Sequence, residues 1–282
     1  MAAALWKISG ETLDLTDRAL IMGVLNVTPD SFSDGGQFAE MDVAVSHGLR
    51  MACEGAHIID VGGESTRPGA DAVSETEELR RVIPVISRLR GRCDASISID
   101  TSKPGVAAAA LDAGASMIND ITGGRDDAML RLAAERRCGL IIMHMQGTPR
   151  TMQQAPHYEN VVEEVSEFFR QQSVRAVGLG IEPMAIAFDP GIGFGKTLEH
   201  NMELLRNLPR LRIADRPLVL GVSRKSFLGK MIGSAKMDDR AAPTLAFTSL
   251  LRERGANVLR VHDVKTNAAA LRVTEALLAN PR

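Results

Sequence analysis

The sequence predicts a single (β/α)8 barrel, a ring of eight parallel strands surrounded by helices. Three observations favour this fold. Eight short apolar runs recur along the 282 residues, a segment with helical periodicity follows each run, and polar residues stand where each run ends. Eight such units take about 35 residues each, which suits a barrel of this kind. An open doubly wound sheet is the rival fold, but it would place ligand groups near one switch point only.

The strands are predicted from continuous apolar character, because a parallel strand covered by helices is buried on both faces. Each run ends in a polar or glycine-rich turn, which marks where the strand stops. In chain order, the predicted strands are residues 19–25, 57–61, 96–99, 116–118, 140–143, 185–188, 218–222 and 258–261.

The helices between the strands are predicted from apolar residues at helical spacing. One such series runs from Leu79 to Leu89 and another from Val161 to Phe169. Pro84 lies inside the first series, so we expect it to kink that helix. No linker or low-complexity segment divides the chain, so residues 1–282 are predicted to form one domain. Residues 1 to about 15 are expected to be a short, frayed N-terminal segment.

Composition excludes several classes of protein. With 33 basic and 35 acidic residues, the net charge of −2 gives no general attraction to nucleic acid or to anionic lipid. No apolar stretch approaches the ~18 residues of a membrane span, and no secretory signal is evident. Cys53, Cys93 and Cys138 form no Cys-x-x-Cys pair, so neither a disulfide framework nor a zinc site is expected. We therefore expect a cytoplasmic protein with neither nucleic-acid nor membrane partners.

Basic residues cluster after three of the predicted strands. Barrels commonly bind phosphate with the loops after strands seven and eight, so an anion site for a phosphate or diphosphate is predicted there. Asn26, after the first strand, offers a neutral oxygen to Mg2+, which usually keeps most of its waters. The alternative is solvated surface charge. The basic residues of this cluster are Arg67, Arg224, Lys225, Arg260 and His262.

A second set of polar residues follows strands three, four and six. Asp100, Asn119 and Asp189 are rich in acceptors, and the amide can also donate. Such a trio suits a flat heterocycle with an amino-pyrimidine edge. The alternative for each of them is a helix cap, because strand-end Asp residues also cap the helix that follows.

The run DPGIGFGKT, residues 189–197, resembles a phosphate-binding loop but lacks the required pattern, since Pro190 stands where glycine is needed. Its glycines allow either close approach of the backbone to a ligand or a tight turn, and the first interpretation is favoured here. His144 lies between two methionines, with no Ser or Cys nucleophile evident beside it. We expect it to be a satisfied, partly buried histidine.

Five motifs resemble those of the dihydropteroate synthase family in order and spacing, and the resemblance spans residues 20 to 275. The motifs are MGVLNVTPDSFSDGG at 22–36, IDVGGESTRPG at 59–69, IDTSKP at 99–104, DPGIGFGK at 189–196 and SRKS at 223–226. The resemblance implies a transferase of folate biosynthesis. It would join 4-aminobenzoate to 6-hydroxymethyl-7,8-dihydropterin diphosphate, giving 7,8-dihydropteroate and pyrophosphate.

The resemblance also implies roles for individual residues. Asp100, Lys225 and Arg260 would be catalytic, and the diphosphate would leave before the amine attacks, which requires Mg2+ near Asn26 but no nucleophilic side chain. Asp100, Asn119, Asp189, Lys225 and Arg260 would bind the pterin; Asn26, Thr66, Arg67, Arg260 and His262 the diphosphate; and Phe32, Thr66, Pro68, Phe194 and Ser226 the aminobenzoate.

Two further properties follow from the family. Its members form dimers through helices close to the last strand in chain order, so a homodimer is expected. The run RAAPT at 240–244 departs from the family pattern in that region, where relatives usually carry a small residue such as Gly. The loop that carries Phe32 has no obvious insertion, so sulfonamides, which resemble aminobenzoate, are expected to inhibit.

Two alternatives remain. A pterin-dependent methyltransferase barrel would share the Asp and Asn contacts but would not need the basic cluster. A catalytically silent paralogue that only binds pterin would be expected to lose some of these side chains, and none is lost.

Overall fold

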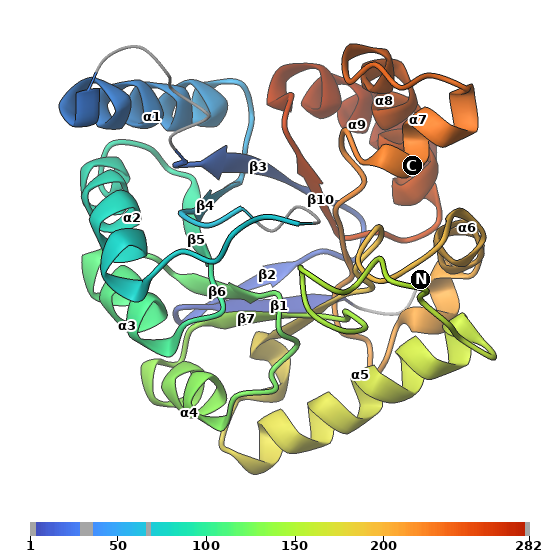
Figure 1. Ribbon diagram of the computed structural model, residues 1–282, viewed down its shortest axis with the longest axis horizontal. Helices are drawn as coiled ribbons and strands as arrows, with labels where there is room; N and C mark the ends of the chain where they lie inside the picture. The colour runs from blue at the N-terminus through green and yellow to red at the C-terminus, as the bar shows by residue number, and fades with distance from the viewer. Residues whose placement is uncertain (1–3, 29–35, 66–68, 280–282) are drawn as a thin grey trace.

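The predicted barrel is the fold that a computed structural model of the chain adopts (Figure 1). The structure describes residues 4–28, 36–65 and 69–279, with side chains from residue 41 onward in the second of these segments. Eight parallel strands pair in chain order, and an isolated parallel bridge between Phe188 and Leu218 joins β8 to β9 and closes the ring. The strands are β3 (Leu20–Asn26), β4 (Ile58–Gly62), β5 (Ser96–Asp100), β6 (Met117–Asp120), β7 (Gly139–Met143), β8 (Ile186–Asp189), β9 (Val219–Leu220) and β10 (Val258–Val261).

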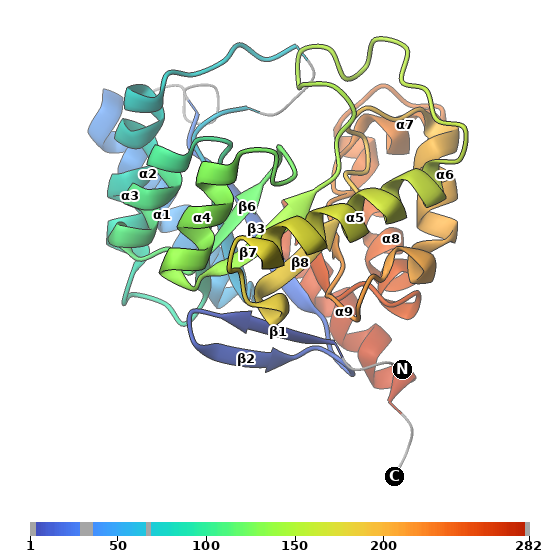
Figure 2. The same cartoon turned by 90° about the horizontal axis from the view of Figure 1, so that it is seen from below.

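Helices surround the ring of strands, as Figure 2 shows from the side. They are α1 (Gly36–Cys53), α2 (Glu75–Leu89), α3 (Pro104–Ala113), α4 (Asp127–Arg136), α5 (Val161–Gly178), α6 (Leu198–Arg206), α7 (Ser226–Ile232), α8 (Ala241–Glu253) and α9 (Val264–Leu278), with short 3-10 turns η2 (Pro183–Ala185), η3 (Leu208–Leu211) and η4 (Asp238–Arg240). The helix α2 begins at the Ser74 cap, whose side chain accepts from the Glu77 amide, and it continues through Pro84. The loops after the strands gather at the end of the barrel that faces the viewer in Figure 1.

Alternation along the strands divides the core into two parts. One set of residues, such as Ile59 and Ile118, faces outward and packs against the helices. The other set faces into the barrel, where Met22, Ile58 and Met117 pack together. They lie near the lower end of the barrel, which is the end opposite the loops that follow the strands. Both sets are buried, which explains why the strand sequences are continuously apolar.

The N-terminal segment is a β-hairpin, so the expectation of a frayed segment is wrong for residues 4–15. β1 (Leu5–Ile8) pairs antiparallel with β2 (Glu11–Asp14). The Trp6 side chain is fully buried with the inward-facing residues of the barrel, and its indole nitrogen donates to the Ala185 carbonyl at 3.1 Å. The hairpin therefore covers the lower end of the barrel, as Figure 2 shows. The apolar surface of Trp6 explains why this end is ordered, because its burial favours docking of the hairpin.

The predicted strand boundaries agree with the structure to within about two residues at each end, a usual precision for such boundaries. The seventh strand of the barrel is shorter than its prediction at 218–222, because only Val219–Leu220 form regular strand. Here the ring is held together by β10 on one side and by the single bridge from Phe188 on the other.

Candidate active site

The inward-facing positions change from apolar to polar toward the loop end of the barrel. On β4, β6, β8 and β10, the polar residue comes two positions after an inward-facing apolar residue: Ile58 precedes Asp60, Met117 precedes Asn119, Ala187 precedes Asp189 and Val258 precedes Arg260. Because side chains two apart on a strand share a face, these polar groups point into the barrel mouth. Asp100 ends β5 in the same layer, and Gly62 of β4 lies opposite it.

Arg260 connects two carboxylates from distant parts of the chain. Its Nε donates to Asp60 Oδ2 at 2.6 Å, and its terminal nitrogen donates to Asp100 Oδ2 at 2.7 Å. Asn119 Nδ2 also donates to Asp60 Oδ2, at 3.1 Å. Residues from β4, β5, β6 and β10 thus form one hydrogen-bonded layer across the barrel.

The charges in this layer are unusual because water is largely excluded. Burial raises the pKa of Asp100 to about 7, although the Arg260 guanidinium opposes that shift. Burial by itself would lower the pKa of Arg260, but the carboxylates of Asp60 and Asp100 outweigh it and raise that pKa. The second oxygens of Asp60 and Asp100 are buried with no hydrogen-bond partner in the described part of the chain. Above the pKa of Asp100, both of these oxygens are buried acceptors available to donors on a ligand.

A second pair of charges lies on the other side of the mouth. Burial lowers the pKa of Lys225 to about 8, and the Asp189 carboxylate partly offsets this. Burial raises the pKa of Asp189, and Lys225 opposes it. The Lys225 ammonium donates to the Ile192 carbonyl and lies 4.3 Å from the centre of the Phe194 ring. Asp189 Oδ1 accepts from the Gly191 amide at 2.7 Å.

The other predicted residues lie around this centre. The His262 ring contacts the Ser223 hydroxyl at 3.0 Å, while Arg224 and Ser226 are exposed at the start of α7. Asn26 is half-buried at the end of β3, opposite Gly62. Four predicted residues lie outside the described residues: Phe32, Thr66, Arg67 and Pro68.

The glycines after β8 make a tight turn that packs against protein. A Cβ added at Gly191 would lie 1.9 Å from the His144 carbonyl oxygen, and one added at Gly195 would lie 2.6 Å from that of Gln146. Both residues have positive φ. For these two positions, the favoured interpretation of close approach to a ligand is wrong, because the neighbour that excludes a side chain is the loop after β7.

His144 is a satisfied histidine, as predicted, and it is buried where a partly buried one was expected. Its ring packs edge-on against Phe168, with 5.0 Å between the ring centroids, and Nδ1 lies 3.0 Å from the Lys196 ammonium. Burial, with a smaller contribution from Lys196, lowers the pKa of His144 to about 2. The ring is therefore neutral and serves as an acceptor.

Sequence reasoning missed three charged groups near the mouth. Asp60 belongs to the motif at 59–69 and received no role there, although its position two residues after Ile58 is the signal that it faces inward. Lys196 follows the glycine turn and is 3% exposed. Lys103 binds the carboxylates of Glu64 and the fully buried Glu78, which ties the loop after β4 to α2 and α3. No periodic pattern in the sequence points to the last two.

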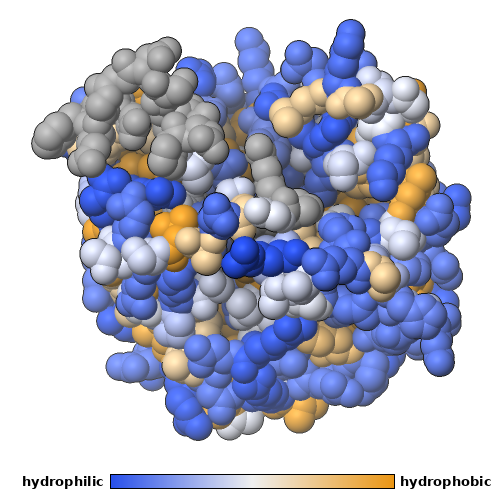
Figure 3. Space-filling model, viewed as in Figure 1, coloured by the Kyte–Doolittle hydropathy of each residue, from blue (hydrophilic) through white to orange (hydrophobic). Residues whose placement is uncertain are grey.

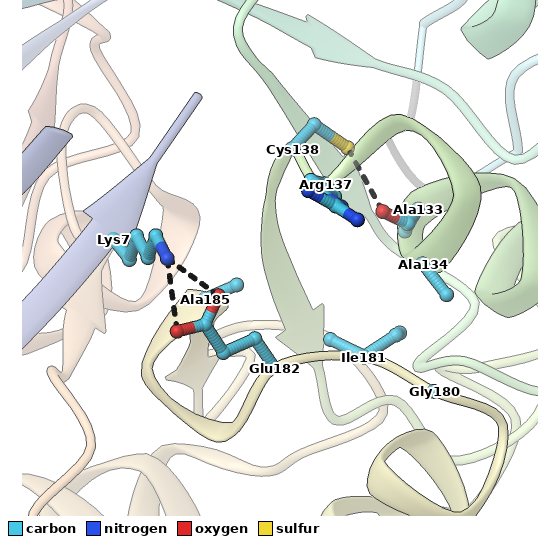
Figure 4. Close-up of a pocket in the computed structure, with 9 residues that line it drawn as sticks. All are labelled: Lys7, Ala133, Ala134, Arg137, Cys138, Gly180, Ile181, Glu182 and Ala185. Carbon is cyan, nitrogen blue, oxygen red and sulfur yellow. Dashed lines mark hydrogen bonds and ion pairs between the residues drawn. The ribbon is translucent and has the colours of Figure 1, made fainter. Parts of the chain in front are cut away.

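A pocket elsewhere in the structure does not compete with this site. It lies beside β1 and the start of β7, at the end of the barrel away from the polar layer (Figure 4). Lys7 and Glu182, 2.7 Å apart, pair with each other at its edge, and Arg137 is exposed. The face seen in Figure 3 includes the mouth of the barrel and is mainly hydrophilic.

Within the described ranges, no three His, Cys, Asp or Glu side chains gather as a metal cluster. No helix among those same residues is long and apolar enough to span a membrane.

Comparisons with known proteins identify the family and the fold. The family model for pterin binding enzymes matches residues 22–262. A dihydropteroate synthase of Synechocystis is 46% identical over 270 residues, covering 95% of this chain and 93% of that protein. The solved structure of Xanthomonas albilineans dihydropteroate synthase with 4-aminobenzoic acid has a TM-score of 0.92 at 45% identity and covers 99% of this chain and 100% of that one. The Yersinia pestis dihydropteroate synthase in a sulfonamide drug complex has a TM-score of 0.91 at 43% identity, covering 98% and 100%.

Proposed function

This chain belongs to the dihydropteroate synthase family of pterin-binding enzymes, and we propose how its residues perform the family's reaction. The enzyme is a transferase of folate synthesis that joins 4-aminobenzoate to 6-hydroxymethyl-7,8-dihydropterin diphosphate, giving 7,8-dihydropteroate and pyrophosphate. The bond between the pterin methylene carbon and the diphosphate oxygen breaks. A bond from that carbon to the amine nitrogen forms, and the amine loses a proton.

The observation that carries this proposal is the polar layer around Arg260. An amino-pyrimidine edge offers several N–H donors, and the free oxygens of Asp60 and Asp100 are buried acceptors with no partner among the described residues. Asn119 supplies an amide from the same layer, and Asp189 a carboxylate from the opposite side. A flat pterin lying across the mouth would replace the missing hydrogen bonds of these groups.

The charges suit departure of the diphosphate before attack by the amine. As that bond breaks, the pterin becomes cationic and the leaving group gains negative charge. Asp100 and Asp189 lie on the side of the pterin, so ionised carboxylates there would stabilise the cation. Lys225, Arg260 and His262, together with Arg67, would stabilise the leaving diphosphate. No covalent intermediate with the protein is required.

We also propose that Mg2+ takes part, with Asn26 as its ligand from the protein. The donor chemistry fits, because Mg2+ prefers oxygen ligands and is often held by one or two protein groups together with substrate phosphates. Asn26 is half-buried at the end of β3 and carries a side-chain carbonyl oxygen. When bound, the ion would neutralise charge on the diphosphate.

The aminobenzoate pocket is proposed to include Phe194 and Ser226, with Phe32, Thr66 and Pro68 from the loops after β3 and β4. The ring of Phe194 is half-buried beside the Lys225 ammonium, so it offers an apolar face next to a charge. Sulfonamides resemble aminobenzoate, and a relative was solved in a sulfonamide drug complex. We propose that they inhibit this enzyme as well.

A homodimer is proposed from the exposed apolar side chains of the last helices. Met231 and Ile232 of α7, Met237, and Leu250 of α8 are all at least 44% exposed. Such a group of exposed apolar residues is typical of an interaction surface. A cytoplasmic location is also proposed, because Cys53, Cys93 and Cys138 are all free thiols.

The test of the function is product formation by the purified protein. Dihydropterin diphosphate and Mg2+ are supplied with and without 4-aminobenzoate, and pyrophosphate and dihydropteroate are both measured. We expect both products only when the amine is present, and a sulfonamide should compete with it. A folded sample that binds the pterin but forms no dihydropteroate would overturn the proposal in favour of a binding protein.

A further inference from the structure

The most unusual group outside the proposed mechanism is the buried amino group of Lys196, whose pKa is lowered to about 7 by burial and partly held up by the Asp189 carboxylate. Its Nζ lies 2.9 Å from the Phe194 carbonyl, 3.1 Å from that of Gly191 and 3.4 Å from that of His144. It also lies 3.0 Å from His144 Nδ1. A buried ammonium is costly unless its three donors have acceptors, and here the protein provides all of them.

The Lys196 nitrogen carries N–H donors whether or not it is charged, and burial lowers the pKa of His144, which favours the neutral ring. When Lys196 donates to His144 Nδ1, the proton of the neutral ring is on Nε2. Lys196 thus joins the loop after β7, which contains His144, to the glycine turn after β8, which contains Gly191 and Phe194. The steric fit of Gly191 against the His144 carbonyl joins the same two loops.

The glycine turn supplies two groups that face Lys225. The Ile192 carbonyl accepts from the Lys225 ammonium, and the Phe194 ring lies under that ammonium. Lys196 holds the carbonyls of Gly191 and Phe194, which stand on either side of Ile192. The position of this turn therefore determines where the Phe194 ring lies relative to Lys225.

We propose that Lys196 is a positioning residue for the aromatic amine substrate. By holding the turn from Gly191 to Phe194, it fixes the Phe194 ring at the place where the amine must lie beside the pterin. Lys196 does not touch either substrate. The inference rests on the proposed function, since it assigns to Phe194 a face of the aminobenzoate pocket.

The variant Lys196→Met tests this role, because it keeps the length and apolar stem of the side chain and removes every donor. The carbonyls of Gly191 and Phe194 then lose their partner, so we expect the turn to shift. A shift of a positioning group by about 1 Å is enough for a large kinetic effect, so the KM for 4-aminobenzoate should rise about tenfold or more. The KM for dihydropterin diphosphate should change much less.

One control variant and one further variant of the same turn separate positioning from general stability. Lys236→Met makes the same substitution at an exposed lysine and should leave both KM values unchanged. Tyr158→Phe removes the bond from the Tyr158 hydroxyl to the Gly195 carbonyl, 2.8 Å long, and so loosens the same turn beyond Phe194. If Lys196 only stabilised the fold, Lys196→Met and Tyr158→Phe would lower Tm and leave the ratio of the two KM values as in the wild type.

The outcomes distinguish this inference from the proposed function. If the wild type forms no dihydropteroate, the proposed function itself fails. If the wild type is active and Lys196→Met leaves the KM for aminobenzoate unchanged, only the positioning role is refuted. Should Lys196→Met not fold, Lys196→Gln retains one donor group for the Phe194 carbonyl and is measured in the same way.

Nitrogen-15 NMR of the wild type tests the His144 contact separately. We expect a neutral His144 ring with its proton on Nε2, and a protonated ring near pH 6 would overturn the contact.

Discussion

The ion pairs of Arg260 permit a quantitative prediction for the variant Arg260→Met. The change removes two charge-assisted hydrogen bonds, each worth about 1.5–3 kcal/mol, so their loss amounts to about 3–6 kcal/mol. Removing one partner of a buried ion pair lowers the free energy of unfolding by a comparable amount, about 3–5 kcal/mol. Asp60 is fully buried and Asp100 is 7% exposed, so water cannot replace the lost partner. We expect a loss of about 3–5 kcal/mol in the free energy of unfolding near pH 8.

The size of this loss should depend on pH. Asp100 keeps its proton in the folded enzyme up to about pH 7, whereas in the unfolded chain it ionises near 3.8. Folding therefore binds a proton between these values, and the contribution of Asp100 to stability falls as pH rises through that window. Arg260 lowers the pKa of Asp100, so without Arg260 the window extends above pH 7. Above pH 7, the free energy of unfolding of the variant should therefore keep falling as the pH rises, whereas that of the wild type should not.

Urea unfolding of both proteins at about pH 5.5 and about pH 8.5 measures the difference. The matched control is Arg170→Met on α5, whose exposed ion pair with Glu167 should contribute about 0–1 kcal/mol at either pH. The reasoning would be refuted by a loss below about 1 kcal/mol for Arg260→Met, or by a loss that is equal at both pH values.

Three other predictions concern the same site. Asp60→Asn keeps the shape of the side chain but removes the charge that faces Arg260. In steady-state assays, kcat/KM for dihydropterin diphosphate should therefore fall about 10- to 100-fold, which is a loss of about 1.4–2.7 kcal/mol in transition-state stabilisation. An unchanged value would remove Asp60 from the site. Lys225 has its pKa lowered to about 8, so its ammonium is present below that pH and lost above it. A pH profile of kcat/KM should therefore decline through pH 8, and Lys225→Arg should shift the decline upward; the same decline in both proteins would exclude Lys225 as its cause. Gly191→Ala places a Cβ 1.9 Å from the His144 carbonyl oxygen at a residue with positive φ, so it should lower the free energy of unfolding in urea by about 3 kcal/mol or more. Gly178→Ala is the control, because Gly178 lies at the end of α5 with open space around it, and the change should be neutral or slightly stabilising. Equal effects of the two substitutions would contradict the tight packing of the turn.

Local sequence patterns were enough to predict most of the fold. Continuous apolar runs locate the strands because both faces of a parallel strand are buried, and β4 begins and ends within a residue of its prediction. The hairpin at residues 5–14 was missed because its stability comes from Trp6, which packs against barrel residues more than 100 positions away. Neither its length nor its composition distinguishes it from a frayed terminus.

Polar residues at strand ends also identified much of the candidate site. Asp100, Asn119, Lys225 and Arg260 do meet at one mouth, because the carboxyl ends of parallel strands all lie on the same side of a barrel. The sequence could not assign a partner to Asp60 or a purpose to Lys196. Both depend on contacts between loops or strands that are distant in the chain.

The sequence by itself determined the order of strands and helices and the residue types at the mouth. These follow from periodicity, which is a local property of the chain. Only the tertiary structure decided that Arg260 would bind Asp60 and Asp100, which lie 200 and 160 residues before it. Closure of the barrel places β10 next to β3, and burial then makes the pairing of these charges obligatory, since an unpaired charge in that layer would be strongly destabilising.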